Sequence, residues 1–200
     1  RGLVGSEMCI RDSIEYTYPE ATFTEGSYRT VRDAISDIQD IEPGKEVTDS
    51  YFTLPPHPEA QGLEKELRGR CLHNHITTAT RETALSRFKA LKAGENFHDL
   101  SPELKTTYSN AERTQNTIYM RLKYDEPSGT VVNVRKSMWI HPELDRAISI
   151  REAARLQTFP DSFIFEGTKD SQYQQVGNAV PPFLAKAVAE SIISILDQVQ

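Results

Sequence analysis

The sequence predicts a folded chain that mixes helices with short strands, on three observations. Stretches of helical apolar spacing are interspersed with short stretches of strand-like alternation. Hydrophobic residues make up 38% and charged residues 26% of the 200 residues, which is typical of a folded globular chain. The apolar stripe near the carboxyl end needs a large surface to pack against, and no stretch of this chain predicts a sheet that could supply it.

The first elements follow from local signals. Residues 14–18 alternate large apolar with polar side chains and indicate the tail of a strand. Thr30 and Asp33 have the spacing of a capping box, so a helix is expected to begin there and to end at Pro43. The prolines of residues 42–61 favour an irregular connection between two units of the chain.

The middle of the chain predicts a helix and a hairpin. Residues 80–93 have helical spacing, and Gly94 stands where a left-handed cap is needed. Residues 118–124 and 130–134 are expected to be short strands, joined by a hairpin turn over residues 125–129.

Three later helices have recognisable starts. Ser101 precedes a proline suited to a first helical turn, and Ser149 begins a second capping box, with Phe159 and Pro160 ending that helix. The last helix starts at Pro182 and carries one apolar stripe up to Val199, and the sequence contains no apolar run of membrane-spanning length.

A distinctive segment, Gln-Val-Gly-Asn-Ala-Val-Pro-Pro at residues 175–182, lies before the last helix. It predicts a stiff turn that tolerates a positive φ and holds the amide of Asn178 in one direction. Two interpretations remain open, because such an amide suits a ligand site but also serves as an ordinary cap for the next helix.

Charge is unevenly distributed along the chain. The net charge is −6, yet residues 61–140 carry 13 basic and 9 acidic side chains. Local Lys and Arg density governs phosphate binding more than net charge does, so this basic third is compatible with DNA contact. A solvated helical face explains the same excess.

Residues 146–161 and 175–182 strongly resemble the last two motifs, IX and X, of the DNA cytosine-5 methyltransferases. The resemblance extends weakly to residues 119–142 and 30–35. It implies an α/β fold, namely the C-terminal part of a Rossmann-like S-adenosylmethionine-dependent methyltransferase with a small mixed α+β target-recognition domain. Residues 14–44 would end the catalytic domain, 45–145 would form the recognition domain, and 146–200 would return to the catalytic domain. Residues 1–13 are interpreted as a non-native leader.

The resemblance also assigns roles to residues. Asn178 and Val180 match positions that line the S-adenosyl-L-methionine site, and Thr130 matches a threonine that approaches the DNA backbone near a flipped cytosine. The basic residues of motif IX are expected to give structural support: Arg146, Arg151 and Arg155. Clustering within the basic third, rather than the resemblance, motivates a set of DNA contacts: Arg68, Arg70, Arg81, Arg87 and Lys89.

No catalytic residue is expected in this chain. The family uses a cysteine in a Pro-Cys-Gln context, whereas Cys9 lies in Met-Cys-Ile and Cys71 in Arg-Cys-Leu. The interpretation is therefore a C-terminal half that transfers methyl groups to double-stranded DNA only with a missing N-terminal half. The alternative is a stand-alone, non-catalytic DNA-binding module. Two cysteines fit a cytoplasmic protein, and no membrane partner is expected.

A metal site is not expected. Cys71, His73 and His75 alternate along the chain, but no second pair stands at a zinc-like spacing. His141 is predicted to be structural, and Trp139 is predicted to belong to the core rather than to stack on a base.

Overall fold

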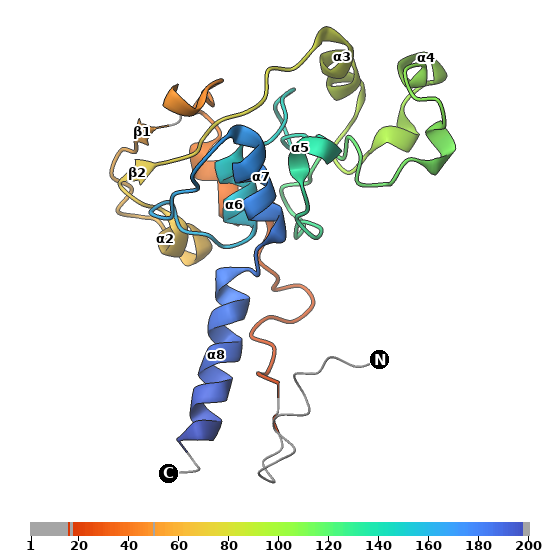
Figure 1. Cartoon of the computed structure of the whole chain (residues 1–200). Helices are drawn as coiled ribbons and strands as arrows, with labels where there is room; N and C mark the ends of the chain where they lie inside the picture. The colour runs from red at the N-terminus through yellow and green to blue at the C-terminus, as the bar shows by residue number, and fades with distance from the viewer. Residues whose placement is uncertain (1–15, 17, 50, 198–200) are drawn as a thin grey trace.

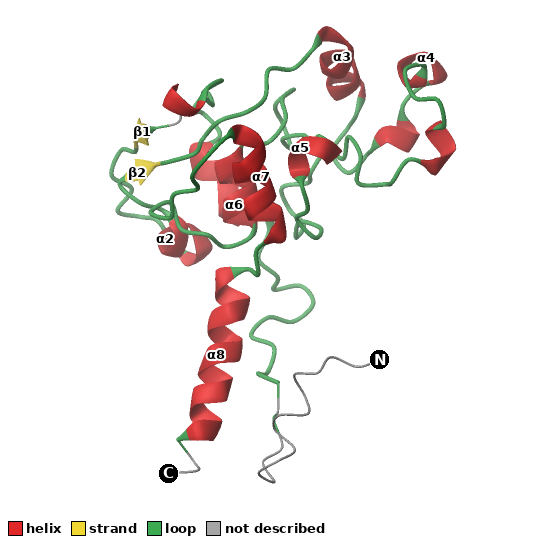
Figure 2. Ribbon diagram, viewed as in Figure 1, coloured by secondary structure: helices red, strands yellow, loops and turns green. Residues whose placement is uncertain are grey.

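The computed structural model describes residues 16, 18–49 and 51–197. This part of the chain is mainly helical, and its only sheet pairs β1 (Phe52–Thr53) with β2 (Cys71–Leu72) in antiparallel register (Figure 2). The α-helices in chain order are α1 (Val31–Ile35), α2 (Gly62–Leu67), α3 (Glu82–Ala90), α4 (Pro102–Lys105), α5 (Val134–Ser137), α6 (Ile150–Leu156), α7 (Lys169–Asn178) and α8 (Pro182–Leu196). Short 3₁₀ turns lie between them: η3 (Ser36–Ile38), η4 (Val47–Asp49), η5 (Phe97–Asp99) and η6 (Ala111–Arg113).

Capping explains where α1 and α6 begin. The Thr30 hydroxyl accepts from the Asp33 amide while the Asp33 carboxylate accepts from the Thr30 amide, and Ser149 and Glu152 do the same for α6. Both predicted capping boxes are confirmed. The helix after Thr30 is shorter than predicted, because it tightens into η3 well before Pro43.

The larger of two core clusters joins α1, α2, α6 and α7 with residues 52–76. Leu63 and Leu67 of α2 are buried here beside Ile35 of α1, which explains why the proline-rich stretch before them does not separate two cores. The structure thus differs from the predicted boundary at residue 45, since residues 52–76 share a core with the carboxyl-terminal helices.

The smaller cluster holds α3 and residues 97–119, which form the lobe that extends to the upper right in Figure 1. Trp139 is fully buried in the larger cluster, and the next residue, Ile140, is fully buried in the smaller one. Because successive side chains of an extended segment point to opposite sides, residues 139–140 lie between the two cores. The prediction of Trp139 as a core residue is confirmed.

The predicted hairpin over residues 118–134 is wrong. Arg121 forms an isolated parallel bridge with Ile140, which in turn bridges Ala147, so residues 118–124 pair with a segment much later in the chain. Residues 130–133 form no strand, and α5 begins at Val134 because the Asn133 side chain caps it.

The predicted turn at residues 175–182 begins later than expected. Gly177 and Asn178 belong to the last turn of α7, a helix that periodicity did not predict, and Gly177 does not have a positive φ. The chain leaves the helix at Ala179, and Pro181 and Pro182 then set the start of α8. A positive φ therefore does not explain the glycine, whereas the close approach of the Val132 backbone does.

Helix α8 projects from the body beside residues 18–30 (Figure 1). No residue of α8 is buried, and Leu184, Ile193 and Leu196 are each more than half exposed. The apolar face of α8 is thus only partly covered by the described residues, although Phe183 packs against the larger core and Tyr18 and Pro19 lie near Val188. Val199 and all of residues 14–18 except Tyr16 and Tyr18 lie outside the described residues, as does segment 1–13.

Length and composition alone would let one helical stretch of the described chain, Lys169–Leu196, cross a membrane. The stretch is interrupted between Asn178 and Pro182, however, and α8 has 15 residues. At about 1.5 Å per residue α8 is about 22 Å long, which is shorter than the roughly 30 Å of a bilayer core. We therefore interpret α8 as a helix with a partly uncovered packing face.

Candidate functional site

The carboxyl end of α7 presents a free amide beside an apolar groove. The Asn178 side chain is exposed and makes no hydrogen bond to any residue that the structure describes. Val180 is 62% exposed and lines a groove of about 620 Å³ with Tyr18 and Leu184. A mainly apolar groove with a few polar groups near it is typical of a small-molecule site, so this end of α7 is a candidate ligand site.

The segment that carries Thr130 lies directly against the same end of α7. A Cβ placed on Gly177 would lie 2.8 Å from the carbonyl carbon of Val132 and 2.9 Å from the amide nitrogen of Asn133. Thr130 itself is exposed and makes no hydrogen bond to a described residue. The fold therefore brings Thr130 and Asn178, two of the predicted site residues, into one region.

A pair of buried arginines ties α6 to distant parts of the chain. Arg155 donates from Nε and Nη2 to the two Asp161 carboxylate oxygens, at 2.8 and 2.6 Å, and from Nη1 to Asp37 and to the Ala34 carbonyl. Arg151 donates to the carbonyls of His73, Pro160 and Phe163. Both side chains are fully buried.

Burial and ion pairing oppose each other in this cluster. Burial lowers the pKa of Arg155, but Asp161 and Asp37 outweigh burial and raise it. For Arg151 burial prevails over Asp161 and lowers its pKa to about 10. The cluster thus stays charged at neutral pH, and its guanidinium groups hold α1, α6 and the loop after α6 together rather than facing DNA.

Arg146 completes the framework through Glu152. Its two terminal nitrogens donate to the Glu152 carboxylate at 2.8 and 2.7 Å, and Glu152 is fully buried. Burial tends to raise the pKa of Glu152, yet the Arg146 hydrogen bonds and charge bring it down to about 2.

Two buried histidines stay neutral beside Glu152. His75 lies between the Ile41 carbonyl and the Ser149 hydroxyl, and burial lowers its pKa. His141 accepts the amides of Glu143 and Leu144, and burial lowers its pKa to about 4. The prediction of His141 as a structural residue is confirmed.

Two of the residues predicted to contact DNA are instead hydrogen-bonded to other parts of the protein. Arg87 is 5% exposed and donates to the Leu104 carbonyl, the Thr107 hydroxyl and the Tyr119 hydroxyl. Arg68 bonds Asp37 and the Pro55 carbonyl. Neither guanidinium is available to bind phosphate, because both are already hydrogen-bonded within the fold. Breaking these bonds would leave a buried charge without partners, which is costly.

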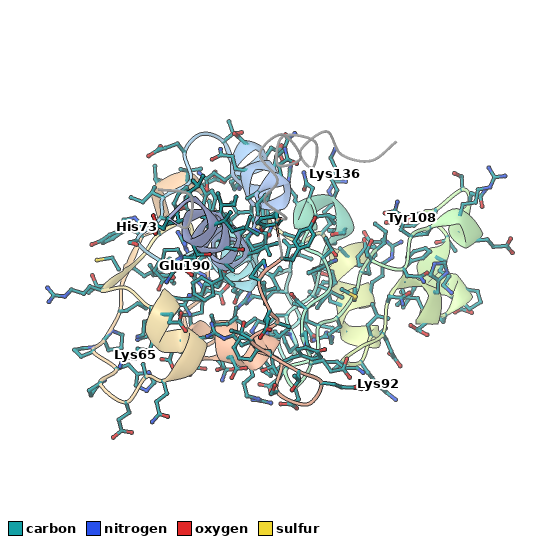
Figure 3. The ribbon with its side chains drawn as sticks, turned by 90° about the horizontal axis from the view of Figure 1, so that it is seen from below. Lys65, His73, Lys92, Tyr108, Lys136 and Glu190 are labelled. Atoms are coloured by element: carbon teal, nitrogen blue, oxygen red, sulfur yellow. The ribbon has the colours of Figure 1, made fainter. Side chains whose placement is uncertain are left out.

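The other three predicted contacts are exposed but do not form one patch. Arg70 lies next to β2, whereas Arg81 and Lys89 lie at the two ends of α3, across the α6–α7 pair from β2 (Figure 1). Further basic side chains also point to different sides of the molecule, as Lys65, Lys92 and Lys136 show in Figure 3. A DNA duplex could reach α3 without reaching Arg70.

The alternating Cys71, His73 and His75 do not converge. The Cys71 sulfur lies 3.0 Å from the Tyr51 hydroxyl, and His75 is bonded inside the core. Within the described residues no three His, Cys, Asp or Glu side chains are placed to hold a metal ion.

Sequence reasoning missed the carboxylates of the framework and the role of Gly177. Asp37 and Arg155 are 118 positions apart, so no local spacing could have paired them. Arg121 was also missed; it is buried and bonds Asp145 and the carbonyls of Phe88, His141 and Leu144. The sequence shows only that Gly177 lies close to a proline pair, and this does not indicate a close backbone contact.

The described part of the chain thus places an exposed amide two residues before the groove-lining Val180, and an exposed threonine on the adjoining segment. Residues 8–194 match the family model described as C-5 cytosine-specific DNA methylase, and the chain therefore belongs to that family. The match begins at residue 8, so it includes the second part of segment 1–13, which was predicted to be a non-native leader.

Individual relatives agree with this assignment. The chain is 35% identical over 191 residues to the type II methyltransferase M.DdeI of Desulfomicrobium norvegicum, covering 87% of this chain and 45% of that protein. It is 34% identical over 185 residues to M1.HphI of Haemophilus parahaemolyticus, covering 92% and 41%. It is also 34% identical over 221 residues to DNA (cytosine-5)-methyltransferase 4 of Arabidopsis thaliana, covering 94% and 14%.

One solved structure shares the fold. It is the crystal structure of a candidate DNA modification methyltransferase encoded within an E. coli prophage, with a TM-score of 0.64 and 24% identity. The match covers 84% of this chain and 47% of that chain. The chain thus has a methyltransferase fold and spans less than half the length of the bacterial relatives given above.

Proposed function

We propose that this chain supplies the DNA-recognition region and one wall of the methyl-donor site of a DNA cytosine-5 methyltransferase. The enzyme would transfer a methyl group from S-adenosyl-L-methionine to C5 of a flipped cytosine in a specific sequence of double-stranded DNA. The observation that carries the proposal is the exposed Asn178 side chain, which bonds no described residue and lies two positions before the groove-lining Val180, in a chain that matches the family over residues 8–194.

The donor fits the residues at the end of α7. Val180 and Leu184 offer an apolar surface for the nucleoside, and the Asn178 amide has donors and an acceptor free for its polar edge. Members of the family use S-adenosyl-L-methionine, which supplies an activated methyl group when bound. In our proposal this chain binds and orients the donor, and Thr130 approaches the DNA backbone.

The attacking cysteine would come from polypeptide outside this chain. Cys71 is partly buried on β2 beside Tyr51, in a sequence unlike that of the family nucleophile. We therefore propose an N-terminal catalytic half as the partner of this chain, in a cytoplasmic enzyme. The exposed apolar face of α8 would pack on that half.

Co-expression with the N-terminal half tests the enzyme against the non-catalytic module. We expect labelled methyl transfer from S-adenosyl-L-methionine to duplex DNA when both parts are present, and none from this chain alone. Tight, sequence-specific DNA binding by the chain without any transfer in the combined preparation would favour the stand-alone module instead.

The exposed basic ends of α3 should contribute to DNA affinity. Replacing Arg81 or Lys89 with glutamine in the complete protein is expected to reduce the slope of log binding constant against log salt by about one unit each. Fluorescence anisotropy of a labelled duplex over a salt series measures this slope. Lys186→Gln on α8 is the matched control, because Lys186 lies outside the recognition region and should leave the slope unchanged.

A further inference from the structure

Gly177 lies inside a helix, where glycine is unfavourable unless something requires it. A glycine inside a helix costs about 1 kcal/mol relative to alanine. Gly177 lies in the last turn of α7 with a φ that any residue can adopt, so backbone conformation does not require it. Close packing does, because the backbone of Val132 and Asn133 occupies the place of a side chain.

The clash would be with backbone atoms, which cannot rotate away. A Cβ on Gly177 would meet the Val132 carbonyl carbon at 2.8 Å, the Asn133 nitrogen at 2.9 Å and the Val132 oxygen at 2.9 Å. Real Cβ atoms essentially never approach this closely. Either α7 or the segment 130–133 must therefore shift when a side chain is introduced.

A second attachment joins the same two parts at the other end of α7. Asn133 caps α5 through its side chain, and Arg135 of α5 forms an ion pair with Asp170 in the first turn of α7. The segment from Thr130 through α5 is thus fixed to α7 at Asp170 and at Gly177. Asn178 is the residue that follows the second attachment.

We propose that Gly177 is a positioning residue that sets the spacing between Asn178 and the Thr130 segment, so that donor binding and DNA binding strengthen each other. The inference rests on the proposed function, which places the donor at Asn178 and the DNA backbone at Thr130. Gly177 touches neither ligand. It acts through the direct contact of two backbones, which transmits a displacement on one side to the other.

Gly177→Ala in the complete protein tests the inference. Donor affinity is measured with and without duplex DNA, and DNA affinity with and without donor, and the two enhancement factors must be equal by thermodynamic linkage. We expect this shared factor to fall towards one in the variant and the KM for DNA to rise about tenfold. A purely structural defect would lower the active fraction and leave both the enhancement factor and KM of the remaining enzyme unchanged.

Gly129→Ala is the matched control. Gly129 precedes Thr130, and a Cβ there would come no closer than 4.0 Å to Met120 and Trp139, so the substitution is expected to leave the enhancement factor unaltered. Asp170→Asn removes the charge of the other attachment at an exposed site without adding a heavy atom, and should lower the factor in the same direction.

Three results would overturn the inference. The first is an enhancement factor that stays at the wild-type value in both Gly177→Ala and Asp170→Asn. The second is an equal loss in Gly129→Ala. The third is wild-type protein that binds donor and duplex with no mutual enhancement. Wild-type protein that binds neither ligand would instead refute the proposed function on which the inference rests.

Discussion

Replacing Arg155 with methionine is expected to lower the free energy of unfolding by about 3–5 kcal/mol. Arg155 is fully buried and is the common partner of Asp161 and Asp37. Methionine fills a similar volume but leaves the buried Asp161 carboxylate without its two charged hydrogen bonds. Urea unfolding of the complete protein, monitored by circular dichroism, measures the loss.

A surface pair provides the comparison. Arg135→Met removes the exposed ion pair with Asp170 and should cost at most about 1 kcal/mol. The double variant Arg155→Met with Asp161→Asn should recover part of the stability, because it removes the uncompensated charge. An Arg155→Met variant no less stable than Arg135→Met would show that the buried framework does not hold the helices together.

Local signals predicted the starts of the helices well. The capping boxes at Thr30 and Ser149 involve residues three positions apart, so sequence alone defines them. The same holds for the proline starts of α4 and α8. The lengths were less predictable, since α1 stops where its surroundings favour a tighter 3₁₀ turn.

Pairing between distant segments could not be predicted from the apolar pattern of the sequence. Residues 118–124 alternate as a strand does, but alternation does not state the partner, and the partner of Arg121 is Ile140 rather than a hairpin strand. Helix α7 was missed for a related reason. Its buried residues include Gln172 as well as Tyr173 and Val176, so its buried face is partly polar and its apolar periodicity weak.

Charge density could not show which of the predicted DNA contacts are bonded within the fold. Arg68 and Arg87 lie in the basic third, yet their partners are an aspartate 31 positions away and the hydroxyls and carbonyls of the smaller core. The sequence alone does not show whether a guanidinium is bonded within the protein or available for DNA. By contrast, Asn178 and Thr130 came from the family resemblance, and the fold brings both into one region with exposed side chains.

Asn178→Ala should weaken binding of S-adenosyl-L-methionine by about ten- to a hundredfold. In our proposal the Asn178 amide bonds the donor beside the groove, and loss of a hydrogen-bonding partner for a ligand costs about 1–3 kcal/mol. Because Asn178 is exposed and bonds no described residue, the substitution should leave the fold intact. Gln174→Ala on an exposed turn of the same helix is the matched control.

Calorimetric titration of the complete protein with S-adenosyl-L-methionine, for wild type, Asn178→Ala and Gln174→Ala at equal folded fraction, tests the donor wall most directly. We expect the alanine at position 178 to raise the dissociation constant at least tenfold while the alanine at position 174 leaves it unchanged. Equal donor affinity in all three proteins would contradict the assignment of this end of α7 to the donor site.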